Sequence, residues 1–153
     1  MLQCNKPEES RRKKVQVVVV DDSQLVCVRI RAMLAEVAEI DVVGEANSAA
    51  SANVLIRQLK PDAVTLDIHL PDGTGFGVLK QLRQNWPDLS EAPVVIMLSN
   101  HTNALYRRKA ESDGANYFLD KSNEFEQVRE ILLSLVCPQH AACGERPARS
   151  DAY

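Results

Sequence analysis

Residues 15–23 read VQVVVVDDS, in which five valines within six positions are followed directly by two aspartates. A mostly unbroken run of β-branched residues is typical of a parallel strand that is buried on both faces. Four more apolar runs of this kind follow along the chain, mostly unbroken rather than alternating. The five expected strands cover residues 15–20, 40–46, 63–66, 94–98 and 117–119.

Between these strands, apolar residues recur at steps of three and four, which is the period of an amphipathic helix. Ser48 is a candidate N-cap for the second helix, and Ser122 or Asn123 for the last. The fourth helix, near residues 102–112, has a poor stripe, which a solvated face and a partner-binding surface explain equally well. In chain order the stripes are Val26, Ile30, Met33, Leu34 and Val37; Ala52, Leu55, Ile56 and Leu59; Leu79 and Leu82; Leu105 and Ala110, around the basic run Arg107, Arg108 and Lys109; and Phe125, Val128, Ile131, Leu132 and Leu135.

Five strands that alternate with five helices predict an α/β fold. Right-handed crossovers then place helices on both faces of a parallel sheet. The expected domain covers residues 15–136, between a flexible basic arm at residues 1–14 and a flexible tail at residues 137–153. The arm has five basic and two acidic residues, whereas the domain has 11 basic and 17 acidic residues.

Composition excludes several classes of protein. The 153 residues fit one domain, and their formal net charge of −3 argues against a basic nucleic-acid binder; the basic run at residues 11–14 is interpreted as a solvated arm. No segment approaches the roughly 18 apolar residues of a membrane span, and the charged N-terminus lacks the apolar core of a signal peptide. We therefore expect a cytoplasmic protein with reduced cysteines, in which Cys27 fills the core; a redox bridge between Cys137 and Cys143 is the alternative.

Polar side chains follow four of the five expected strands. Ligands of such sheets bind at the carboxyl edge, where the strands end. Capping of a helix, or simple solvation, explains any one of these residues, but five of them at one edge predict a site. They are Asp21 and Asp22 after the first strand, Asp67 after the third, Ser99 after the fourth and Lys121 after the fifth.

Three carboxylates that lie together raise one another's pKa unless a cation joins them. Mg²⁺ suits a site that has few protein ligands, several waters and a phosphate group. Beside it, Asp67 becomes a candidate nucleophile toward a phosphoryl group, because carboxylates form aspartyl phosphates. Lys121 and the hydroxyl of Ser99 are then placed to neutralise the other phosphoryl oxygens.

These residues resemble the response regulator receiver domain of two-component signalling, over about residues 14–136. The matching segments are VVVVDDS at 17–23, TLDIHLPDGTG at 65–75, VIMLSN at 95–100 and GANYFLDKS at 114–122. The resemblance implies a flavodoxin-like fold, a five-stranded parallel sheet in the order 2-1-3-4-5 with five helices on its two faces. Pro71 and Gly75 match the family's spacing after the phosphoacceptor, where they shape the loop into the third helix.

The resemblance also implies a role for each site residue. Asp21 and Asp22 bind Mg²⁺, with Asp22 as the direct ligand, and Asp67 is both a metal ligand and the phosphoacceptor. The remaining implied roles are the backbone carbonyl of His69 as a further metal ligand, Ser99 as the hydroxyl, Lys121 as the invariant lysine and Phe118 as the aromatic switch.

Two positions depart from the family's pattern. Ser122 stands where the family often has a proline in a cis peptide, and a cis bond before a residue other than proline costs roughly 3 kcal/mol. Phe118 lacks the hydroxyl of a tyrosine, so a core role and a switching role are both open. His69 and His101 are expected to flank the mouth of the site, where together they would alter attack by water; two ordinary loop histidines are the simpler interpretation.

The implied function is a phosphoacceptor switch rather than an enzyme with an external substrate. A sensor histidine kinase or a histidine-phosphotransfer protein would supply the phosphoryl group, with no nucleic-acid or membrane partner. Output to an unknown protein would pass through the face of the fourth helix, fifth strand and fifth helix. Only 17 residues follow Val136, so we expect a stand-alone receiver, or else a fragment of a longer regulator.

Three other functions are weighed. A haloacid-dehalogenase-type phosphatase requires a D-x-D motif, but the chain reads DDS at residues 21–23. A dinucleotide-binding protein requires G-x-G-x-x-G after the first strand, which is absent. The third alternative is a receiver-like interaction module that works without phosphorylation.

Overall fold

The computed structural model describes residues 14–88, 90–100 and 103–136. A five-stranded parallel sheet forms its centre, in the order β3-β2-β4-β7-β8. In chain order these five strands lie 2-1-3-4-5, which confirms the predicted topology. Their bounds are β2 Val15–Val20, β3 Ile40–Ala46, β4 Ala63–Asp67, β7 Val94–Ser99 and β8 Tyr117–Asp120.

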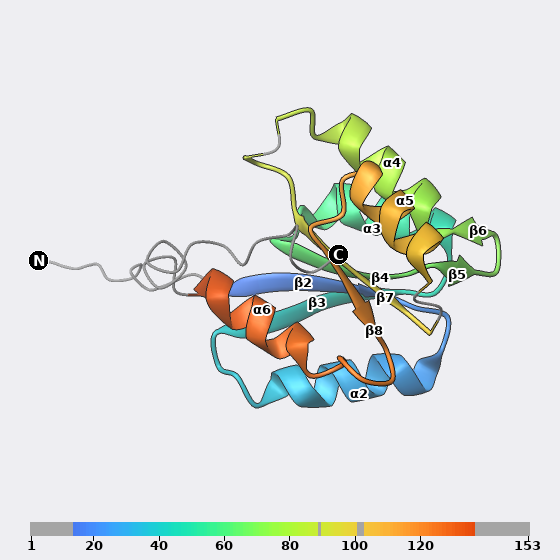
Figure 1. The fold of residues 1–153 in the computed structure, drawn as a ribbon. Helices are drawn as coiled ribbons and strands as arrows, with labels where there is room; N and C mark the ends of the chain where they lie inside the picture. The colour runs from blue at the N-terminus through green and yellow to red at the C-terminus, as the bar shows by residue number, and fades with distance from the viewer. Residues whose placement is uncertain (1–13, 89, 101–102, 137–153) are drawn as a thin grey trace, which may run out of the picture.

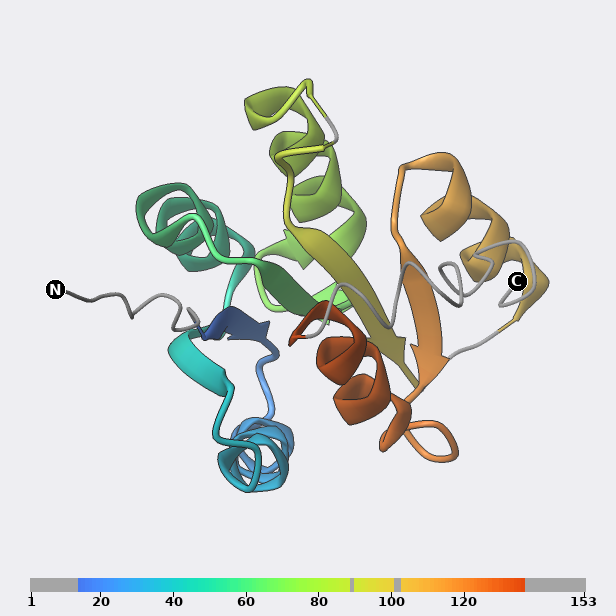
Figure 2. The ribbon, with the colours of Figure 1, turned by 90° about the vertical axis from the view of Figure 1, so that its left-hand side faces the viewer.

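Helices cover both faces of the sheet, as expected. Figures 1 and 2 show α2 and α6 on one face and α3, α4 and α5 on the other. The bounds are α2 Gln24–Ala35, α3 Ala49–Leu59, α4 Gly75–Asn85, α5 Ala104–Ser112 and α6 Gln127–Val136. None of the described helices has the length and apolar character needed to cross a bilayer.

The four consecutive valines of β2, at residues 17–20, are explained by burial on both faces. Val18 and Val20 pack into the cluster beneath α3 and α4, whereas Val17 and Val19 pack into the cluster with α2 and α6. Successive residues of a strand point to opposite faces, so the part of this central strand that is covered on both faces, residues 17–20, is apolar at every position, and Gln16 near its start is exposed.

The ends of two helices differ from the prediction. Residues 121–126 form turns, and α6 begins at Gln127 rather than at Ser122 or Asn123. The carboxylate of Asp120 explains the delay: it accepts a hydrogen bond from the backbone N–H of Ser122 at 2.7 Å and from the Asn123 side chain at 3.2 Å. These two residues therefore close a turn after β8. Likewise α2 ends at Ala35, before Val37.

The cap predicted for α3 is confirmed, and the structure adds a cap for α5 and a short hairpin. Ser48 caps α3, because its hydroxyl accepts from the N–H of Ser51 at 3.1 Å, and the cap of α5 is Asn103. A small antiparallel hairpin was not expected; its strands are β5 His69–Leu70 and β6 Gly73–Thr74.

The loop from β4 into α4 depends on a glycine. A Cβ atom at Gly75 would overlap the backbone carbonyl oxygen of Asp67, and the N–H of Gly75 donates to the carbonyl of Ile68 at 2.7 Å. The helix can therefore start directly against the end of β4. The Lys121–Ser122 peptide bond is trans, since the described residues contain no cis bond.

Candidate functional site

The carboxyl end of the sheet gathers three aspartates. One carboxylate oxygen from each of Asp21, Asp22 and Asp67 lies within 4.8 Å of the others. Asp21 is 3% and Asp67 is 6% exposed, whereas Asp22 is open to solvent. These side chains come together because β2 and β4 are neighbours in the sheet and run parallel.

Lys121 enters this cluster from the end of β8. Its Nζ lies 2.7 Å from Oδ2 of Asp21 and 3.3 Å from Oδ1 of Asp67. The backbone N–H of Lys121 donates to the carbonyl of Ser99 at 3.0 Å, which places the side chain at the edge of the sheet. The ammonium group thus bridges two buried carboxylates.

Burial and charge perturb this cluster in a consistent way. Burial raises the pKa of Asp67, the charge of Asp21 raises it further, and Lys121 and the N–H of His69 oppose the rise. Burial disfavours the charged form of Lys121, but its hydrogen bond to Asp21 and the charges of Asp67 and Asp21 outweigh burial and raise the pKa of the amine. Burial is thus the main cause of the raised pKa of Asp67, whereas the two neighbouring carboxylates cause the rise at Lys121.

The residues present fit a divalent cation. Three carboxylates against one ammonium leave two negative charges, and carboxylate oxygens are the ligands that Mg²⁺ prefers. Both oxygens of Asp21 already have partners, since Oδ1 accepts from the N–H of Ser23 at 2.8 Å and Oδ2 pairs with Lys121. Exposed Asp22 and the carboxylate of Asp67 are therefore the best placed to contribute a direct ligand.

The other expected site residues are spread around this cluster. Ser99 ends β7 and is fully buried; it pairs with Asp120, while its predecessor Leu98 pairs with Asp67. His69 begins β5 with an exposed side chain, and its ring lies 6.0 Å from the ring of Tyr106. Ser99 therefore follows the residue that pairs with Asp67 in the sheet, and His69 lies two residues after Asp67 along the chain.

The remaining two expectations concern Phe118 and His101. Phe118 is 1% exposed and belongs to the core cluster beneath α3 and α4, so its ring points inward in this structure. His101 lies outside the described residues, as do Cys4, Cys137 and Cys143.

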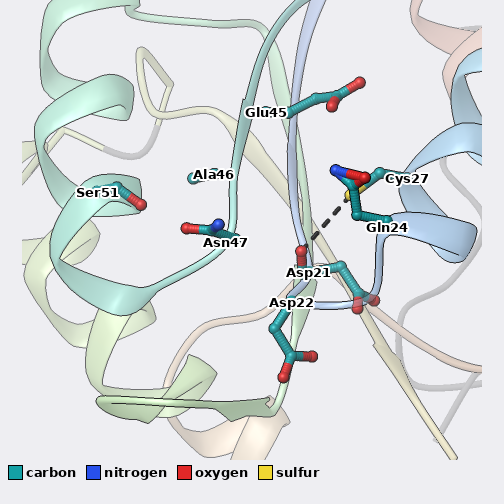
Figure 3. A pocket seen from close by; sticks show the side chains of 8 residues that line it. All are labelled: Asp21, Asp22, Gln24, Cys27, Glu45, Ala46, Asn47 and Ser51. Carbon is teal, nitrogen blue, oxygen red and sulfur yellow. Dashed lines mark hydrogen bonds between the residues drawn. The ribbon is translucent and has the colours of Figure 1, made fainter.

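A pocket of about 270 Å³ opens beside the acidic cluster. Figure 3 shows Gln24 and Cys27 reaching toward it from α2, and Ser51 facing them from α3. The thiol of Cys27 donates to the backbone carbonyl of Asp21 at 3.5 Å, and burial raises its pKa. Cys27 is therefore a buried thiol, as predicted, that also lines the entrance to the aspartates.

Sequence reasoning missed a long-range cap next to the site. The carboxylate of Asp72, between β5 and β6, accepts hydrogen bonds from the N–H groups of Ala49 at 2.6 Å and Ala50 at 3.0 Å. These bonds lower the pKa of Asp72 and tie the loop after Asp67 to the start of α3. No local spacing could reveal this contact, because its partners are more than 20 residues apart.

A second missed residue is Arg83 on α4. Its Nη2 donates to the carbonyl of Gly114 at 2.5 Å, where φ is +97°. Burial lowers the pKa of this guanidinium. The contact fastens the turn between α5 and β8 to α4, on the far side of the sheet from α2.

The amino-acid sequence is similar to a known family of protein domains and to several curated proteins. The profile of the response regulator receiver domain matches residues 17–133. The transcriptional regulatory protein DegU of Brevibacillus brevis is 28% identical over 125 residues, which make up 82% of this chain and 51% of that protein. A protein-glutamate methylesterase/protein-glutamine glutaminase of Alkalilimnicola ehrlichii is 32% identical over an alignment 157 residues long, which covers 90% of this chain and 39% of that protein.

This chain thus spans about half or less of the length of these two relatives. Among solved structures, the response regulator domain of Thermotoga maritima CheB superposes with a TM-score of 0.69 at 29% identity, over 81% of this chain and 94% of that one. The family profile extends from β2 into α6 and takes in every strand whose end contributes to the acidic cluster. The chain therefore belongs to the family of response regulator receiver domains.

Proposed function

We propose that Asp67 accepts a phosphoryl group from a phosphohistidine and that the phosphorylated chain signals by contact with another protein. The observation that carries this proposal is the cluster of Asp21, Asp22 and Asp67 bridged by Lys121. Receiver domains of this family interact with histidine kinases and phosphotransfer proteins, and such a protein is the proposed donor. The chain then turns over no external substrate beyond its own phosphorylation and loss of the phosphoryl group.

In the proposed transfer, a carboxylate oxygen of Asp67 attacks the phosphorus atom of the donor. The P–N bond breaks, its electron pair returns to the imidazole nitrogen, and an acyl phosphate forms on Asp67. Receiver domains bind Mg²⁺ at the acidic pocket; here Asp21, Asp22, Asp67 and the carbonyl of His69 would hold it, and it would supply positive charge to the transferred group.

The residues of the chain share the rest of the work. Lys121 already contacts Asp67, so its ammonium can pair with the phosphoryl oxygens once the negative charge has moved to them from the carboxylate. Ser99 would donate its hydroxyl to another oxygen. The phosphoryl group adds negative charge to a site that already carries an excess, so the arrangement of Lys121 between Asp21 and Asp67 must change, and this provides the signal.

The proposed output surface is the face formed by α5, β8 and α6. Phe118 on β8 is buried behind α5 and lies three residues before Lys121. A change at Lys121 therefore has a short path to this face. The partner on this face is a protein of unknown identity.

Mass spectrometry after incubation with acetyl phosphate and Mg²⁺ tests the proposal. The wild-type chain should gain the mass of one phosphate, and the gain should disappear in Asp67→Asn and in the presence of EDTA. Asp72→Asn is the matched control, because it removes a carboxylate five residues away and leaves the acceptor intact. A folded wild-type chain that gains no phosphate would contradict the proposal and favour a module that works without phosphorylation.

A further inference from the structure

Helix α5 is held to the domain by unusually little aliphatic packing. Among its nine residues only Ala110 is buried, whereas α4 buries five residues over eleven. Leu105 of α5 is 70% exposed. Segments with few buried apolar contacts are the first to open in a folded protein, so the position of α5 depends on the other contacts that hold it.

Those contacts are aromatic and cationic, and besides the ring contact between Tyr106 and His69 of β5 they point in two directions. Toward α4, the ring of Tyr106 lies edge-on to the ring of Phe76 at 5.9 Å, and Nζ of Lys109 lies 5.2 Å from the centre of the same ring. Toward the sheet, the guanidinium carbon of Arg107 lies 5.2 Å from the centre of the Phe118 ring. Arg107 is therefore a direct link between α5 and β8.

Phe118 is suited to carry a signal from the acidic site. It pairs with Met97 in the sheet, and Ser99 pairs with Asp120, two residues further along β8. Residues two apart in a strand share a face, so Phe118 and Ser99 lie on the same side of the sheet as α5. The ring has no hydroxyl, and its π face is consequently the group to which a cation on α5 can be attracted.

We propose that Arg107 is a positioning residue that couples α5 to Phe118, so that the helix follows the ring when the ring moves. The contact makes the position of α5 sensitive to the packing of β8. The part of this proposal that concerns signalling rests on the proposed function, whereas the contact itself does not.

Hydrogen exchange of the α5 amides in the unphosphorylated chain tests the contact. Arg107→Gln should raise exchange over residues 104–112 by roughly two- to thirty-fold, the range that follows from a cation–π contact. Arg108→Gln is the matched control, since it makes the same change at the next, exposed position of the same helix. Arg107→Lys should restore part of the protection, because it keeps the charge. Equal exchange in the Gln variants at 107 and 108 would overturn the proposal.

A double-mutant cycle shows whether Arg107 acts through Phe118. In a Phe118→Leu background, Arg107→Gln should have no further effect on the exchange of α5. Exchange of the α6 amides reports whether the Leu variant keeps its fold. If that variant unfolds, Phe118→Met replaces it, since methionine adapts to the volume of the core. A full effect of Arg107→Gln without the ring would contradict the coupling.

Beryllofluoride with Mg²⁺, used as a phosphoryl mimic, tests the signalling part. The mimic should change α5 exchange in the wild type and in Arg108→Gln, but Arg107→Gln should lose most of this change while α6 exchange stays as in the wild type. A general loss of structure would raise the exchange of α6 as well as that of α5, so unchanged α6 exchange distinguishes a loss of coupling from unfolding. A wild-type chain that does not respond overturns the proposed function together with the signalling step, while the first two experiments still decide whether Arg107 holds α5 to Phe118.

Discussion

Replacement of Lys121 by methionine should reveal the electrostatic cost of the acidic cluster. The methionine keeps the apolar stem but removes the ammonium that lies 2.7 Å from Asp21 and 3.3 Å from Asp67. Both carboxylates are almost fully buried, so neither can turn to water for compensation. Breaking a buried ion pair by removal of one partner is strongly destabilising, because the other charge remains buried.

The size of the effect follows from the geometry. The mutation deletes the contacts of Nζ with Asp21 at 2.7 Å and with Asp67 at 3.3 Å, and removal of one partner of a buried ion pair costs roughly 3–5 kcal/mol. We therefore expect Lys121→Met to lower the free energy of unfolding by about 3 kcal/mol in EDTA at pH 7.5. The raised pKa of Lys121 in the folded chain means that its contribution is fully present below the ordinary lysine pKa of about 10.4. The contribution is lost only as the pH rises through the raised value.

Urea unfolding followed by circular dichroism gives the measurement, with and without Mg²⁺. Added Mg²⁺ should recover a large part of the loss, since a cation bound to the carboxylates replaces the missing charge. Lys80→Met is the matched control: Lys80 is exposed on α4, and its replacement should change stability by less than about 0.5 kcal/mol. A loss below about 1 kcal/mol in Lys121→Met, or the same loss with and without Mg²⁺, would refute this account of the site.

Three further predictions follow from the surroundings of the site. Asp22→Asn should weaken Mg²⁺ binding at least about tenfold in calorimetric titration, with stability in EDTA close to the wild type because Asp22 is exposed. Asp72→Asn should lower the urea midpoint by weakening the start of α3; because the folded-state pKa of Asp72 is depressed, the difference should be constant above about pH 5 and narrow as the pH falls below the ordinary value near 3.9. Gly75→Ala should cost about 1–3 kcal/mol, since its Cβ overlaps the carbonyl of Asp67, whereas Gly73→Ala, with its nearest atom 3.8 Å away, should leave the unfolding free energy nearly unchanged.

The strands were predictable because a buried strand has a locally apolar amino-acid composition. The part of β2 that is covered on both faces, residues 17–20, is apolar at each position, whereas the edge strand β3 has exposed Asp41 and Glu45. The predicted runs at 15–20 and 40–46 match the observed strands at both ends. The other three predicted strands stop one residue early. In each case the additional residue is polar, Asp67, Ser99 or Asp120, because hydrogen bonds of the backbone ladder continue past the point where side-chain hydropathy changes.

The helix ends were less predictable, because capping depends on competing partners. Ser48 caps α3 locally, as predicted, but Asp72 reaches the same helix from a distant loop. At the other end of the chain, Ser122 and Asn123 bond to Asp120 instead of starting a helix. A cap residue that finds a better-placed carboxylate forms a turn there, and residue types alone do not reveal that choice.

The amino-acid sequence alone determined the alternation of strands and helices, the order of the strands through resemblance, and the set of polar residues at the strand ends. Only the tertiary structure decided how those residues pair: Lys121 between Asp21 and Asp67, and Arg107 over Phe118. The physical reason is range. Periodicity and composition record what each residue needs from its immediate neighbours and from burial, whereas an ion pair between residues a hundred positions apart depends on strand order, register and rotamers within a few ångströms.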